Sequence, residues 1–338
     1  MTSNSSDVSL TDPISAAFGD HKIIVSMLPA AVGLVSYFIV GTFGNLNIAV
    51  APFLNPKLRG TCNYLIAMAS FFDSIHMSAH VFLFYFVVTG INIIPLHQCY
   101  RIMLLPIAGL MCGEMVILLI GVDRLFSLLC PTTHRTLNKL PYLLFLLSLC
   151  VALSAWYLYL GYLNQLENPN QLVLCLIIEG VHGYLIEWFT EIAMILNFAT
   201  VACYFVLFVC VRKKGSDAGS KKIFKSLMWI VGVVCGTWFV TAAYANLVTR
   251  YFNLSPPDQA VSLSYSGLFI NAGCSCNFFI LYKCSAEYRK QSKKQLRWLT
   301  CGLIKFSDVD VAPLSRPTRW NTEMQSSTSK YGDSDSVA

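Results

Sequence analysis

The sequence predicts an all-α membrane protein: a bundle of seven transmembrane helices. Hydrophobic residues make up 55% of the 338 residues and charged residues only 12%, which is too little charge for a soluble chain of this size. The apolar residues lie in uninterrupted blocks of about 20 to 28 residues, the length that a helix needs to cross ~30 Å of hydrocarbon. Strands of a membrane barrel would be shorter and would alternate. The blocks cover residues 23–50, 61–89, 98–130, 141–163, 185–211, 223–250 and 259–282.

The basic residues predict the orientation of the bundle. They gather between blocks one and two, three and four, and five and six, and again after block seven. Because positively charged loops stay in the cytoplasm, the N-terminus is expected outside and the C-terminus inside. The net charge of +6 therefore indicates topology, and it gives no support to nucleic-acid binding. The residues are Lys57, Arg59, Arg135, Lys139, Arg212, Lys213, Lys214, Lys221, Lys222, Lys283, Arg289, Lys290, Lys293, Lys294 and Arg297.

The segment before the first block, residues 1–22, is polar and is expected to be extracellular. It shows no cleavable signal peptide, so block one is expected to stay as the first span. Asn4 begins the triplet Asn-Ser-Ser, an acceptor for N-glycosylation on the predicted outer side.

Most of the thirteen cysteines fall inside the blocks or on the cytoplasmic side, where thiols stay reduced. Cys99, at the outer end of block three, and Cys175, between blocks four and five, face the oxidising side. They are the one outer pair available for a disulfide, and two free thiols are the alternative.

Ionisable and amide side chains inside the blocks are costly unless they are paired or face a cavity, so each suggests a function. Those that stand out are, in order along the chain, Asn45 in block one, Asp73, His76 and His80 in block two, Asp123 and Arg124 in block three, Glu187 and Glu191 in block five, and Asn277 in block seven.

These residues, in this order and spacing, resemble the rhodopsin-like G-protein-coupled receptors over roughly residues 30 to 300. Arg124 follows Cys99 by twenty-five residues, as in that superfamily. Further matching positions are Gly44, Cys130, Pro131, Trp156, Tyr204, Trp238, Tyr288 and Arg289. Within the superfamily the chain is most similar to the nematode serpentine chemoreceptors of the Srsx family, in the segments 58–66 and 73–76, in Asp123-Arg124-Leu125 and in the segment 277–280.

The resemblance implies a receptor that binds an extracellular ligand and activates a heterotrimeric G protein, without a cofactor or catalytic residues. Asp123 would restrain Arg124 at rest, and Arg124 would meet the G protein on activation together with Tyr204. The plainer alternative is an ion pair that caps a helix end. Asn45, Asp73 and Asn277 would form a polar network between the ligand site and the cytoplasmic end.

The resemblance also places the candidate ligand pocket in the outer half of the bundle. Its candidates are His76, His80, Glu187, Glu191 and Trp238. If both glutamates face the cavity they favour cationic ligands, but at least one is expected to face the loop or solvent, and Trp238 also fits an ordinary core position. A zinc pair of the two histidines lacks a third ligand.

Two better-known receptor types fit poorly. Pro106 stands where amine receptors carry an aspartate, and block seven has no lysine for retinal.

The chain departs from the superfamily in blocks five to seven, which contain no proline. Leu196, Val240 and Phe278 stand at the usual proline positions, so helix kinks must arise otherwise or be smaller. Gly113 replaces a serine that helps many relatives to hold sodium beside Asp73, and Glu114 is next to it.

Residues 283–300 form a predicted amphipathic helix that lies along the inner leaflet. Cys301 follows as a candidate palmitoylation site. The tail, residues 301–338, is polar and predicted to be disordered, and its Ser and Thr content would suit receptor kinases and arrestin.

The expected location of such a receptor is the plasma membrane, including that of sensory cilia. Two other classes of function are weighed against a receptor. A transporter or channel would show repeated halves or paired broken helices, and neither is present. An enzyme would need a metal cluster or a nucleophile beside a base, and none is evident. Within the receptor class, a neuropeptide or neurotransmitter receptor is the alternative to a chemoreceptor, and the sequence does not separate the two.

Overall fold

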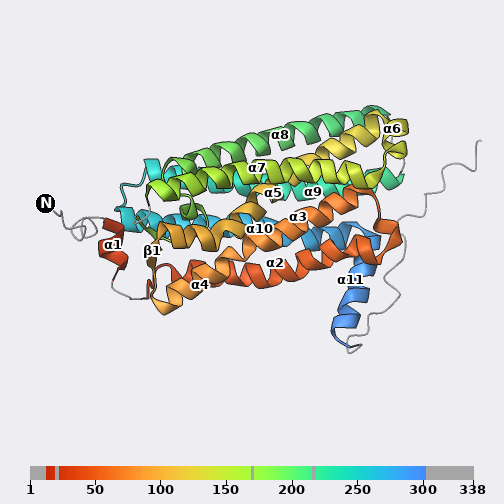
Figure 1. Cartoon of the computed structure of the whole chain (residues 1–338). Coiled ribbons are helices and arrows are strands. Elements are labelled where there is room, and N and C mark those ends of the chain that lie inside the picture. Colours follow the sequence, from red (N-terminus) through yellow and green to blue (C-terminus); the bar gives the residue numbers. More distant parts are fainter. Residues whose placement is uncertain (1–12, 20–22, 169–170, 215–217, 302–338) are drawn as a thin grey trace, which may run out of the picture. The chain divides into compact units, whose positions relative to one another are not determined.

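The computed structural model describes residues 13–19, 23–168, 171–214 and 218–301 (Figure 1). The chain divides into two compact units, Met1–Leu296 and Arg297–Ala338, and the bundle described below belongs to the first. In the second unit, the described residues are the end of helix α11 and the two residues after it, and Cys301 is exposed. Asn4 and the tail beyond Cys301 lie outside the described residues.

Long helices form where the apolar blocks predict them, and the second block forms two helices. They are α2 (Leu28–Leu54), α3 (Thr61–Met77), α4 (Ala79–Thr89), α5 (Leu96–Leu129), α7 (Lys139–Glu167), α8 (Tyr184–Lys214), α9 (Ala218–Arg250) and α10 (Pro256–Cys284). Shorter elements connect them: α1 (Pro13–Phe18), η1 (Pro56–Leu58), β1 (Ile93–Pro95), α6 (Pro131–Thr136), β2 (Leu172–Leu174) and η2 (Ile178–Gly180). Helix α11 (Ala286–Leu299) follows α10.

Six of the segments in the described part of the chain are long and apolar enough to cross a membrane. They are α2, α3 with α4, α5, α7, α8 and α9. Helix α10 has 29 residues, which is length enough, but it is not among the six. Its buried polar side chains, Ser264, Asn271, Ser275 and Asn277, lower its apolar character. The seventh block therefore forms a helix, and its crossing of a membrane stays a prediction.

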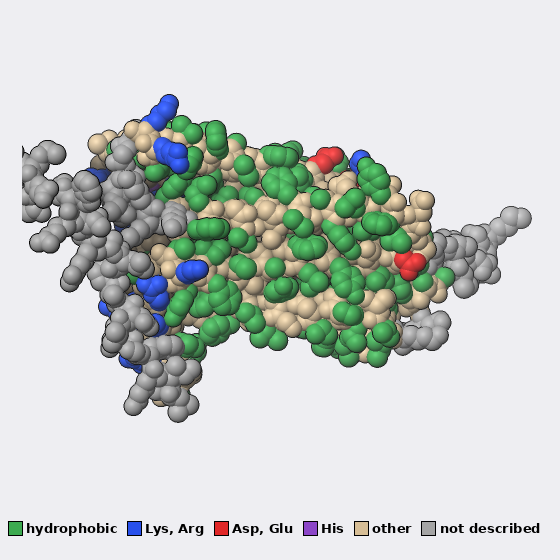
Figure 2. Space-filling model, turned by 180° about the vertical axis from the view of Figure 1, so that it is seen from behind, with side chains coloured by type: hydrophobic (Ala, Val, Ile, Leu, Met, Phe, Trp, Pro, Cys, Tyr) green, Lys and Arg blue, Asp and Glu red, His purple; other side chains and the backbone are tan. Residues whose placement is uncertain are grey.

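The distribution of side chains is inverted relative to a water-soluble protein. Asn45 and Asp123 are fully buried, whereas Phe145, Ile195 and Phe205 are each at least 60% exposed along their helices. Water would penalise so much apolar surface, but lipid does not. In Figure 2 hydrophobic side chains are spread along the whole length of the bundle, and most of the Lys and Arg side chains gather at one end.

Helix α5 lies at the centre of the bundle and packs against α3, α7 and α8. Glycines permit the closest of these approaches. A Cβ atom on Gly109 would come within 2.8 Å of backbone atoms of α3, so no larger residue fits there without moving a helix. Small residues at such crossings let helices in a membrane pack closely.

The second block is interrupted at Ser78, between α3 and α4. The hydroxyl of Ser78 donates to the carbonyl of Ile75 at 2.6 Å, and its backbone N–H donates to the same carbonyl at 3.2 Å. These bonds to the third residue back replace the regular helical bond. Helices α8, α9 and α10, which lack the usual prolines, are each continuous.

Helix α11 is fixed to the rest of its unit by Tyr288. This side chain is buried, and its hydroxyl donates to Oδ1 of Asn63 at 3.4 Å. Burial raises the pKa of Tyr288, so the hydroxyl keeps its proton. Glu287 adds an exposed ion pair with Lys57 at 3.5 Å, which contributes little in water.

Candidate functional site

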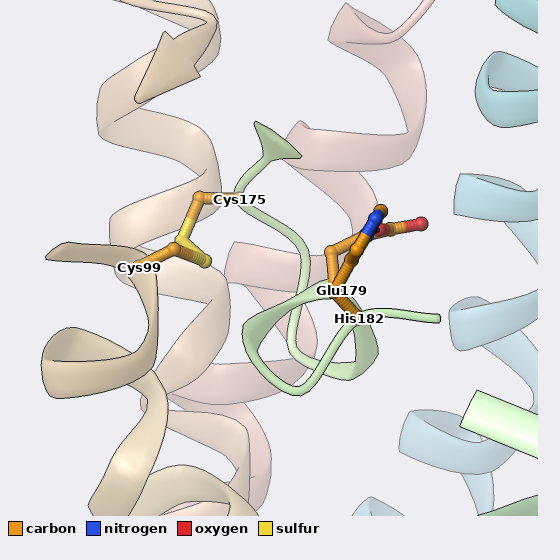
Figure 3. Close-up of a disulfide and its surroundings, with 4 residues drawn as sticks. All are labelled: Cys99, Cys175, Glu179 and His182. Carbon is orange, nitrogen blue, oxygen red and sulfur yellow. Dashed lines mark hydrogen bonds and ion pairs between the residues drawn. A yellow bond between two sulfur atoms is a disulfide. The ribbon is translucent and has the colours of Figure 1, made fainter. Parts of the chain in front are cut away.

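A disulfide fixes the loop between α7 and α8 to the start of α5. Strand β2 in this loop pairs antiparallel with β1, and Cys175 directly after it is bonded to Cys99 (Figure 3). The predicted disulfide is thereby confirmed. We call the end of the bundle that carries it the outer end, and the opposite end the inner end.

Beneath this loop lies a cavity of about 680 Å³. The loop contributes Leu176, Ile177 and Ile178 to its wall, directly after the disulfide. The other walls come from α2, α3, α4, α5, α8, α9 and α10. A mostly apolar cavity of this size, with a few polar groups, is typical of sites for small ligands.

All five residues that the sequence singles out for a pocket line this cavity. They are His76, His80, Glu187, Glu191 and Trp238. The sequence predicted that at least one glutamate faces the loop or solvent, and both are in fact exposed. Both also line the cavity, together with Thr190 and Met194 on the same face of α8. The rings of the two histidines pack edge to face, with centroids 5.8 Å apart.

Trp238 agrees with both interpretations of it made from the sequence, a pocket residue and an ordinary core residue. It lines the cavity, and it is also part of the core, where it packs against Phe189 with ring centroids 6.1 Å apart. A ligand in the cavity would therefore touch a side chain whose other contacts reach from α9 to α8.

Below the cavity, a buried amide and a buried carboxyl group join α10 to α3. Nδ2 of Asn277 donates to Oδ2 of Asp73 at 3.1 Å. Asn45 does not bond to Asp73, and its Nδ2 donates instead to the backbone carbonyl of Cys274 at 3.4 Å. The three predicted network residues are thus joined through α10, with only one direct side-chain pair.

A second buried pair joins α5 to α8. Nδ2 of Asn197 donates to Oε2 of Glu114 at 3.0 Å and to the carbonyl of Ala193 at 2.9 Å. Glu114 therefore has a partner on α8, and Gly113 beside it lets Asp73 approach closely, since a Cβ there would be 3.3 Å from Oδ1.

At the inner end the carboxylate of Asp123 is completely buried and is surrounded by donors. Nε of Arg124 donates to its Oδ2 at 3.0 Å, and the hydroxyl of Thr61 does so at 3.3 Å. Nε2 of His134, on α6, lies 3.0 Å from Oδ1. Arg124 also donates to Thr61 at 3.3 Å. We call Thr61, Asp123, Arg124 and His134 the inner cluster.

Tyr204 lies deep between α8 and α5. Its ring packs against Gly121, where a Cβ would come within 2.6 Å of the ring, and its hydroxyl has no hydrogen-bond partner among the described residues. It lines a small cavity of about 20 Å³ together with Asn277 and Leu281.

Sequence reasoning missed three members of these sites: Thr61, His134 and Asn197. His134 had one available signal, since Pro131 is a favourable first residue of a helix and His134 lies in the last turn of that short helix. That short helix carries the imidazole back to Asp123. Thr61 and Asn197 gave no comparable signal.

Within the described residues, no three His, Cys, Asp or Glu side chains lie close enough to hold a metal ion. His76 and His80 remain a pair without a third such ligand.

Comparison with known proteins gives one result that bears on the whole bundle. A family model described as serpentine type 7TM GPCR chemoreceptor Srsx matches residues 38–296, more than half of the chain. The match includes the buried pairs, the inner cluster and all the cavity residues except Leu34. No curated protein matches the chain.

Proposed function

We propose that this chain, which belongs to the Srsx family of serpentine 7TM G-protein-coupled chemoreceptors, binds an extracellular ligand in the outer cavity and activates a heterotrimeric G protein at its inner end. The single observation that carries the proposal is the pairing of an outer cavity beneath the disulfide-bonded loop with a buried, charged inner cluster in one helical bundle.

We infer that α10 is the seventh span. Its polar side chains face inward, so Asn271, Ser275 and Asn277 are buried by other helices and not by lipid. With seven spans and the basic residues at the inner end, residues 1–22 are outside and the C-terminus is in the cytoplasm. Residues 23–282 then form the receptor domain, and residues 283–300 lie along the inner leaflet of the plasma membrane. Cys301, which is exposed, suits a lipid anchor there.

The proposed mechanism is a shift between two states of the bundle. In the state described here Asp123 holds Arg124 and is itself held by His134. A ligand that binds the other state more tightly would shift the population, and Arg124 would leave Asp123 to meet the G protein. The buried pair Asp73–Asn277 and the residues Asn45 and Tyr204 lie between the two ends and would transmit the change. Arrestin and receptor kinases would act on the tail.

The experiment is to express the full chain in cells, screen small odorants and peptides with cAMP and calcium readouts, and then compare variants. Arg124→Ala is expected to abolish the response while surface expression survives. Arg101→Ala is the matched control, because Arg101 is an exposed arginine at the outer end of the same helix. A normal response from Arg124→Ala would contradict the proposal.

A further inference from the structure

The outer cavity has an acidic wall and, away from it, a neutral hydrogen-bonding wall. We infer that its ligand is a small organic cation: an ammonium group at the acidic wall, an apolar body, and a neutral polar group at the far end. This inference rests on the proposed function only in taking the cavity as the ligand site.

The acidic wall is formed by α8. Glu187 and Glu191 are one helical turn apart and line the open side of the cavity, where both are exposed, with Thr190 between them. Two like charges at this spacing repel each other by a few tenths of a kcal/mol. Within the described part of the chain neither glutamate forms an ion pair, and Arg250, which also lines the cavity at the end of α9, is not paired with either. A bound cation would relieve the repulsion and supply the missing counter-charge.

The neutral wall is formed by α4 and α10. His80 is only 5% exposed and Asn271 only 1%, and both line the cavity. Nε2 of His80 and Oδ1 of Asn271 are buried and make no hydrogen bond of normal geometry among the described residues, although the two side chains lie near enough to interact with each other. Nδ2 of Asn271 donates within its own helix to Gly267 at 2.8 Å. Leaving such an atom unpaired costs ~1–3 kcal/mol, so a polar group of a ligand would gain by meeting it.

The rest of the wall is largely apolar, although Thr241, Asn246 and Ser264 also belong to it. It includes Leu34, Leu83, Leu110, Phe189 and Ile270. Leu110 is the one residue that α5 contributes, and it carries no charge. The carboxylates that can bind a cation in the cavity are therefore those of Glu187 and Glu191 on α8. A carboxylate ligand would face two glutamates, and a hydrocarbon would leave both polar walls unpaired. The volume, about 680 Å³, suits a small molecule.

The test measures binding to the purified full-length chain in lipid nanodiscs, as the rise in unfolding temperature with ligand concentration. The probes are hexylamine, hexanol and hexanoate, which differ only in the head group, and aminohexanol, which adds a hydroxyl at the far end. We expect hexylamine to bind at least tenfold more tightly than hexanol, hexanoate to bind least, and aminohexanol to bind most tightly.

Variants then assign the preference to residues. Glu187→Gln with Glu191→Gln should remove the tenfold preference for hexylamine and leave hexanol binding unchanged, which also shows that the variant is folded. His80→Leu should remove the advantage of aminohexanol over hexylamine. Glu179→Gln is the matched control. Glu179 lies in the loop beside His182, is not part of the cavity wall, and should change nothing (Figure 3).

Three results would overturn the inference: equal binding of hexylamine and hexanol, an amine preference that survives in the double variant, or no binding of any probe. Preferred binding of hexanoate would also do so and would point to Arg250. This binding assay contains no G protein and is therefore independent of the proposed function. If the chain binds amines here but fails to drive nucleotide exchange once a G protein is added, the proposed function is defeated and the ligand class still stands.

Discussion

Removing the charge of Asp123 should raise signalling in the absence of ligand. The carboxylate is fully buried and accepts hydrogen bonds from Arg124 and Thr61, with His134 at 3.0 Å. Asp123→Asn keeps the shape of the side chain but removes the charge that holds Arg124. If these hydrogen bonds exist only in the resting state, the variant lowers the stability of the resting state and leaves that of the active state unchanged.

The magnitude follows from the contacts. A hydrogen bond to a charged group contributes ~1.5–3 kcal/mol, so Asp123→Asn should lower the stability of the resting state by about 2 kcal/mol relative to the active state. That loss raises the ratio of active to resting receptor about 30-fold. A receptor that is active about 1% of the time would become active roughly 23% of the time. His134→Ala removes one contact to the same carboxylate, about 1.5 kcal/mol, and should raise the ratio about 12-fold.

The assay is GTPγS binding by a G protein in membranes that contain equal amounts of each variant at the surface. His182→Ala is the control, because His182 also lies beside a carboxylate, Glu179 at 3.5 Å, but in the outer loop. The reasoning is refuted if Asp123→Asn reaches the surface normally and its basal nucleotide exchange equals that of the unchanged chain.

Three further predictions concern stability. Asn277→Leu deprives buried Asp73 of its amide donor and should lower stability by about 2 kcal/mol in thermal unfolding, and an unchanged midpoint would count against the pair. Tyr204→Phe removes a hydroxyl that has no partner, so the midpoint should stay or rise while G-protein activation falls; a large drop in the midpoint would show a missed partner. Cys99→Ser opens a loop of 76 residues and should cost about 4 kcal/mol, with the same loss in Cys175→Ser and in the double variant. Unequal losses of stability among these three variants would contradict a disulfide between Cys99 and Cys175.

The positions of the helices could be predicted from apolar block length, because lipid demands a nearly fixed length of apolar helix. Block three, residues 98–130, corresponds to α5, Leu96–Leu129. The ends of α8 and α9 extend beyond their blocks, since a helix can continue into water without apolar residues. The break at Ser78 could not be predicted from the sequence, because it depends on local hydrogen bonds of one serine and not on a glycine or proline.

The site residues were predictable where a single rule decided them. Cys99 and Cys175 were the one pair on the oxidising side, and both glutamates lie on one face of a helix. The partner of Asn45 was not predictable, because the rotation of one helix against another is set by packing. His134 was missed for a similar reason: only the fold of α6 brings it back to Asp123.

The central claim is that α10 completes a bundle of seven spans, although by length and composition six described segments qualify. Short epitope tags at the two ends of the chain, probed in intact and in permeabilised cells, test this directly. We predict that the N-terminal tag is stained in intact cells and the C-terminal tag only after permeabilisation. Both tags on the same side would mean an even number of crossings, and the inner cluster could not then be assigned to the G protein.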